Sequence, residues 1–133
     1  MSNGKNEDRL FKVFCNECDE RMQRALAILE QHGGANFNAE SYDKLHQEFD
    51  SLVGAARAVN MPEMEQFNRV MAVFTRYLRN KLPLAASQEE KLLLRKAVEL
   101  TTRCQNSTQH CILKHPQQVQ SLLNAVQGIL EKG

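Results

Sequence analysis

Tryptophan is absent from this chain, and tyrosine, proline and glycine are scarce, with two, three and six copies among 133 residues. Aromatic residues make up only 6% of the sequence, and no segment alternates β-branched with polar side chains. Because strands favour aromatic and β-branched residues, their scarcity argues against a sheet. The hydrophobic share of 42% and the charged share of 25% are ordinary for a globular protein. The composition therefore predicts an all-α fold, and the length predicts a single domain over residues 1–133.

An excess of charge of one sign is also missing, because 17 basic residues meet 16 acidic ones and leave a formal charge of +1. Such a balance creates no global field toward nucleic acid or anionic lipid, so we expect neither as a partner. The polar segment 1–8 lacks the apolar core of a signal peptide, and no apolar run is long enough to span a bilayer. We therefore expect a cytoplasmic protein with reduced cysteines and with residues 1–7 disordered.

Apolar residues recur at three- and four-residue steps in five segments, which is the spacing of amphipathic helices. The expected helices cover about 8–31, 39–59, 62–81, a fourth segment from 87 to at least 104, and a last one from 116 onward. Whether the fourth helix continues through the polar segment 105–109 stays open. The pattern predicts an antiparallel bundle of four or five helices.

Several expected helix ends carry residues suited to them. Asn38 can cap the second helix, and Ser87 with Glu90 has the spacing of a capping box. Asn60 suits a left-handed position at the end of the second helix, and Pro62 suits the first position of the third. So short a connection requires the second and third helices to run antiparallel.

Cysteine and histidine could form a metal or redox site. Cys15 and Cys18 have the spacing of a paired site, and further ligands could come from Cys104, His110, Cys111 and His115. Both paired cysteines, however, fall on the apolar stripe of the first helix, where cysteine packs as a small hydrophobic residue. No turn separates them, as a zinc knuckle would require, and they do not lie at a helix start. We therefore expect neither a metal nor a cofactor.

A motif connects the second and third expected helices: Phe49-Asp50-Ser51-Leu52-Val53-Gly54-Ala55-Ala56, followed by Asn60-Met61-Pro62-Glu63. This run resembles the signature of histidine phosphotransfer (HPt) domains, which occur in two-component signalling and at the N-terminus of chemotaxis histidine kinases. A weaker likeness extends over nearly the full length, through the opening helix at 8–14 and Leu82-Pro83-Leu84. The resemblance implies an antiparallel four-helix bundle, here with an additional C-terminal helix.

The chain departs from the HPt pattern where that family does its chemistry. In the family, a phosphorylatable histidine stands four residues before the glycine, and a nearby lysine helps to hold the phosphoryl charge. Gly54 matches the glycine, but Asp50 replaces the histidine and Val53 the usual lysine. A carboxylate does not substitute for the imidazole, because its acyl phosphate needs a metal and a lysine close by. Asp50 would carry roughly half the charge of a phosphorylated side chain.

We therefore expect a binding module of a phosphorelay or chemosensory system that docks a receiver domain or a histidine kinase without catalysis. The expected docking residues are His46, Asp50, Val53, Gly54 and Arg57. One alternative is an active phosphotransfer protein that uses His46 as a displaced acceptor, although a surface histidine without this role is the commoner case. The other alternative is a structural or oligomerisation bundle unrelated to phosphorelay. The sequence does not name the partner, the signal or the oligomeric state.

Overall fold

The computed structural model describes residues 2–31, 38–102 and 115–132, with side chains from residue 9 onward except those of Gln31 and Thr102. These residues form five helices and no strand, so the predicted all-α class is confirmed for the described part of the chain. The helices are α1 (Ser2–Gln31), α2 (Ala39–Ala58), α3 (Pro62–Asn80), α4 (Gln88–Thr102) and α6 (Pro116–Lys132). None of these helices is both long and apolar enough to cross a membrane.

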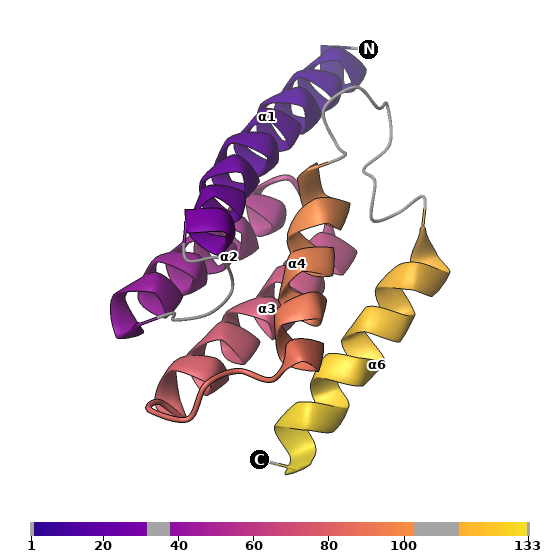
Figure 1. Ribbon diagram of the computed structural model, residues 1–133. Helices are drawn as coiled ribbons and strands as arrows, with labels where there is room; N and C mark the ends of the chain where they lie inside the picture. Colours follow the sequence, from indigo (N-terminus) through magenta and orange to yellow (C-terminus); the bar gives the residue numbers. More distant parts are fainter. Residues whose placement is uncertain (1, 32–37, 103–114, 133) are drawn as a thin grey trace.

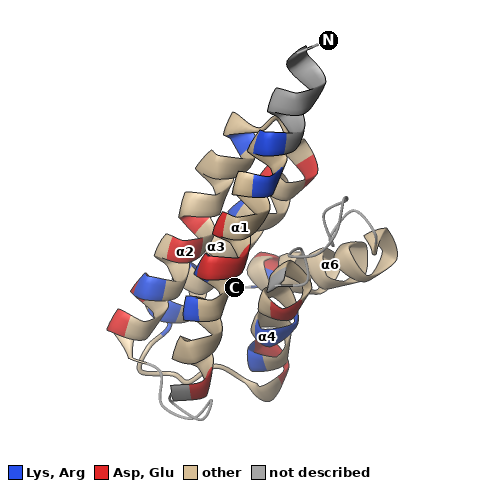
Figure 2. Cartoon of the chain, turned by 90° about the horizontal axis from the view of Figure 1, so that it is seen from above, with Lys and Arg blue, Asp and Glu red and all other residues tan. Residues whose placement is uncertain are grey.

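Successive helices run in roughly opposite directions, and α6 descends beside α4 (Figure 1). The most extensive packing joins α2 to α3, while α1 packs against both α2 and α4. The last helix, α6, packs against both α3 and α4. Seen from above, α1, α2 and α3 gather on one side, with α4 and α6 on the other (Figure 2). The fifth helix therefore helps to join α3 to α4.

The core follows the predicted apolar stripes. Phe14, Phe49, Phe67 and Phe74 are each at most 2% exposed and come from α1, α2 and α3. Cys15 and Cys18 are buried in the same cluster, which confirms that they pack as core residues. On α3 the apolar residues that recur at helical spacing are buried: Met64, Phe67, Val70, Met71, Phe74 and Leu78. Burial of these side chains supplies the main driving force that holds the helices together.

The predicted helix caps and the predicted turn at Asn60 and Pro62 are confirmed. The Ser41 amide donates a 2.9 Å hydrogen bond to Asn38 Oδ1 at the start of α2. Asn60 adopts the left-handed conformation with a φ of 57°, and Pro62 opens α3. The capping box also forms, because the Ser87 amide donates to Glu90 Oε1 at 2.8 Å while the Glu90 amide donates to Ser87 Oγ at 3.1 Å.

Three expected helix boundaries differ from the structure, and the start of α1 differs most. The helix α1 begins at Ser2, so residues 2–7, predicted to be disordered, continue the helix. The segment contains no proline, and extending a helix that is already formed by core packing costs far less than starting one. The ends of α2 at Ala58 and α3 at Asn80 lie one residue before their predicted positions.

Candidate functional site

The expected docking residues occupy one side of α2, and the structure gives them different environments. We call His46, Asp50, Gly54 and Arg57 the α2 stripe, because steps of four, four and three residues keep them on one face of the helix. Asp50, Gly54 and Arg57 are exposed, whereas His46 is half-buried. Asp50 forms no hydrogen bond or ion pair with any residue that the structure describes.

Val53 does not belong to this surface. Its side chain was expected among the docking residues, but it is only 8% exposed and offers almost no surface to a partner. Each residue along a helix is rotated by about 100° from the one before, and this step turns Val53 from the exposed side of Gly54 toward the interior. Val53 and Gly54 lie three and four residues after Asp50, so helical spacing alone allowed either of them to share a face with Asp50.

His46 is tied to the neighbouring helix. Its Nδ1 lies 2.8 Å from the carbonyl oxygen of Ala72 in α3. A carbonyl only accepts hydrogen bonds, so Nδ1 carries the proton, and the neutral ring then presents an unprotonated Nε2. The expectation of an ordinary surface histidine is therefore incomplete, because this ring is half-buried and held in one tautomer.

Gly54 has open space around it. A Cβ atom built on this residue would meet no atom within 4 Å. Gly54 is exposed to solvent and lies in the middle of the α2 sequence, away from its ends. The packing of α2 therefore does not require a glycine here, although glycine in a helix interior costs up to about 1 kcal/mol relative to alanine. A residue that lowers the stability of a helix and is not required by packing is typical of a functional surface.

We expect the substitution Gly54→Ala to raise the free energy of unfolding by about 0.5–1 kcal/mol. The added methyl group meets no neighbour, and alanine loses less backbone entropy in forming the helix. Urea denaturation followed by circular dichroism measures the change. A destabilised Gly54→Ala protein would show that the space around Gly54 is not open.

Arg57 takes part in an ion-pair cluster that joins α2 to α3. Arg57 and Arg69 both donate to Glu65 Oε2, at 2.9 and 2.6 Å. The hydrogen bond from Arg57, supported by the one from Arg69, holds the pKa of Glu65 below its usual value despite the opposing effect of desolvation. Two cations thus share one carboxylate, and the cluster keeps a net charge of +1.

The exposed side of α3 extends this surface. Contacts from His46 to Ala72 and from Arg57 to Glu65 set α2 and α3 side by side in antiparallel register. Val73, which follows Ala72, is an exposed large hydrophobic residue at 50%. Arg69 and Arg76 flank it at helical spacing, and both are exposed. We call the α2 stripe together with Arg69, Val73 and Arg76 the α2–α3 face.

Arg69, Val73 and Arg76 belong to this face but were not among the expected docking residues. Their signal was present, because the apolar stripe of α3 leaves positions 69, 73 and 76 on the opposite side of the helix. Arg76 forms no ion pair with any residue that the structure describes, so its charge remains available to a partner.

The candidate metal ligands are not brought together in the described residues. Cys15 and Cys18 are buried in the core, and His115 lies half-buried just before α6. Cys104, His110 and Cys111 lie outside the described residues. Within residues 2–31, 38–102 and 115–132, no group of three or more histidine, cysteine or acidic side chains is placed to hold a metal ion.

Comparisons with known proteins identify no family: no family model matches the chain, and no curated protein or solved structure matches it significantly.

Proposed function

We propose that this chain is a non-catalytic relative of HPt domains that binds a receiver domain or a histidine kinase in the cytoplasm. Helices α1 to α4 would form the HPt-like bundle, with α6 as the additional C-terminal helix. The observation that carries the proposal is an exposed Asp50 one turn before an exposed Gly54 with no neighbour at its Cβ position. These are the positions at which the resembled motif places its acceptor and its glycine.

The charge and shape of the α2–α3 face support contact with an acidic partner. Gly54 leaves a flat place on α2, and Val73 on α3 offers apolar area. The arginines around them keep more positive than negative charge, because Arg57 and Arg69 share Glu65 and Arg76 has no counter-charge among the described residues. Charge complementarity of this kind raises the association rate and selects between partners.

The chemistry of Asp50 supports binding without phosphotransfer. A carboxylate that accepts a phosphoryl group forms an acyl phosphate, which needs a cation to hold the added charge. Val53 supplies no ammonium group at the place of the usual lysine, and its side chain is buried. Asp50 would instead present a fixed negative charge within the basic face.

The test is binding of the full chain to the receiver domains and histidine kinases of its host, measured by calorimetry. We expect Gly54→Arg to weaken binding by about twentyfold or more, because the new side chain occupies the flat place against which the partner packs. Gly128→Arg on α6 is the matched control, since a Cβ atom at Gly128 also meets nothing within 4 Å. Circular dichroism checks that both variants remain folded.

Two outcomes would reject the proposal. One is the absence of binding to any receiver domain or histidine kinase of the host. The other is equal loss of binding in Gly54→Arg and Gly128→Arg, which would place the interface away from the α2 stripe.

A second candidate function is phosphotransfer through His46, and one observation favours it. The hydrogen bond from Nδ1 to the Ala72 carbonyl leaves Nε2 as the nucleophilic nitrogen of the ring. We expect no phosphate on the protein after incubation with a kinase and ATP. An acid-labile, alkali-stable phosphate that disappears in His46→Gln would replace the binding proposal with this one.

A further inference from the structure

A groove lies between α4 and α6, away from the α2–α3 face. Its volume is about 620 Å³, within the range of roughly 300–1,000 Å³ that small-molecule sites occupy. Leu93 and Leu100 line it from α4 and Leu122 from α6, and all of them are buried. The groove therefore has an apolar base that extends for about two helical turns, or roughly 10 Å.

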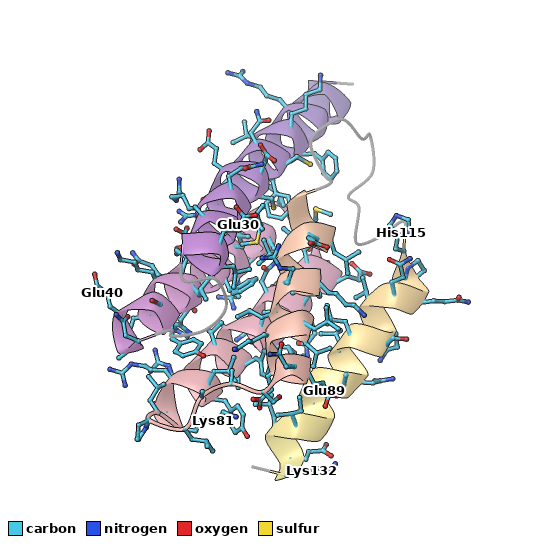
Figure 3. All side chains as sticks on the ribbon, viewed as in Figure 1. Glu30, Glu40, Lys81, Glu89, His115 and Lys132 are labelled. Carbon is cyan, nitrogen blue, oxygen red and sulfur yellow. The ribbon has the colours of Figure 1, made fainter. Side chains whose placement is uncertain are left out.

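Polar groups line the groove above this base. The α6 side contributes Gln117, Gln118 and Ser121, which carry amide and hydroxyl groups but no charge. The ribbon of α6 is almost entirely uncharged along its length (Figure 2). Figure 3 labels Glu89 at the start of α4 and His115 just before α6, and these two residues lie toward opposite ends of the α4–α6 pair.

The charged side chains that line the groove, Lys96 and Glu99, both come from α4. Lys96 lines the groove, is exposed, and forms no ion pair with any residue that the structure describes. Glu99, the other charged lining residue, lies 3.8 Å from Arg95 and has its charge partly compensated there. Counted with Arg95, the two charged lining residues Lys96 and Glu99 leave a net charge of +1 on this part of α4, and Lys96 is the cation that lines the groove.

We propose that this groove binds a small amphiphilic anion, with its apolar body on the leucines and its acidic group at Lys96. A largely apolar cleft with a few polar groups and one uncompensated cation is the usual chemistry of such a site. Leu92, one turn before Lys96 on α4, is also exposed and adds apolar area beside the groove. The α2–α3 face shares no residue with this groove, so the binding of an amphiphilic anion can be tested independently of the proposed function.

Decanoate is the probe for a test with the full-length chain, and binding is followed by NMR chemical shifts and by calorimetry. We expect saturable binding with shifts that centre on α4 and α6, and weaker binding of 1-decanol and decylamine, which share the chain but lack the negative charge. We expect Lys96→Glu to weaken decanoate binding about fivefold or more while leaving 1-decanol binding unchanged. Lys12→Glu on α1 is the matched charge control.

A second variant fills the groove. Ser121→Trp places a large side chain in the groove from an exposed position of α6, and we expect it to remove binding of both decanoate and 1-decanol. Gln127→Trp is the control, because Gln127 is exposed on the same helix but does not line the groove. The proposal is overturned by the absence of saturable binding, or by decanoate binding that neither Lys96→Glu nor Ser121→Trp weakens.

Discussion

Replacing Glu90 by alanine is expected to lower the free energy of unfolding by about 2–3 kcal/mol, which corresponds to roughly 10 °C in Tm for a chain of this size. Glu90 Oε1 accepts both the Ser87 amide at 2.8 Å and the Lys81 ammonium group at 2.6 Å. The Glu90 side chain is 7% exposed and that of Lys81 19%. Alanine leaves the ammonium group half-desolvated without its partner and removes one side of the α4 cap.

The size of this effect follows from the place of Glu90 in the fold. It lies at the start of α4, where Lys81 reaches it from the end of α3. Figure 3 shows Lys81 and the neighbouring Glu89 at the same end of the molecule. The ammonium group also lies 5.5 Å from the ring centre of Tyr77, so it is held on two sides. Loss of Glu90 therefore loosens the junction between two helices as well as one cap.

The contribution of Glu90 should depend on pH in a defined direction. Burial raises the pKa of this carboxyl group, but the hydrogen bonds from Lys81 and Ser87 outweigh burial and hold the pKa below its ordinary value of 4.5. The stabilisation is therefore fully present above pH 4.5 and is lost as the pH falls through the lower pKa of the folded state. Urea denaturation between pH 3 and 7 measures the difference between the wild type and Glu90→Gln, which should shrink toward low pH.

Glu89→Ala is the matched control, because Glu89 occupies the same helical turn but is exposed. Its effect should stay within about 0.5 kcal/mol. Equal destabilisation by Glu89→Ala and Glu90→Ala would show that the general charge of the helix start, rather than the buried contact with Lys81, provides the stability.

The second large effect is expected at Phe49, the first residue of the motif that resembles HPt domains. Phe49 is completely buried in α2, and its removal in Phe49→Ala should cost about 3–5 kcal/mol by leaving a cavity in the core. This loss is a large part of the roughly 5–15 kcal/mol that stabilises a typical domain. Thermal and urea unfolding of the purified variant give the value.

Phe49→Leu keeps the prediction testable if the alanine variant does not fold. Leucine preserves most of the apolar volume, so this substitution should cost only about 1–2 kcal/mol. It should also leave partner binding unchanged, because Phe49 is not part of the α2–α3 face. A Phe49→Leu protein as unstable as the alanine variant would point to a shape requirement for the ring rather than to lost apolar volume.

The sequence anticipated more of the fold than of the candidate site. The burial of the cysteines and of the α3 core follows from apolar residues repeated at steps of three and four along one helix. The caps at Asn38, Asn60 and Ser87 depend on residues at most one turn apart. Both kinds of pattern are visible in the sequence alone. The position of Asp50 on an exposed face was also predicted, because it lies opposite the buried residues of α2. By contrast, Val53, which was expected on the exposed docking face, is buried.

Only the tertiary structure revealed the interactions between residues that are far apart in the chain. His46 and Ala72 are separated by 26 positions, so nothing local could reveal the bond that fixes the tautomer of the ring. The orientation of α2 against α3 likewise decides between Val53 and Gly54, which adjoin in sequence but differ by 100° around the helix. The sequence by itself therefore determined which segments are helical and which faces are apolar. The packing of α2 on α3 and of α6 on α4 then determined which polar residues stand together, because that depends on contacts between helices rather than on spacing within one.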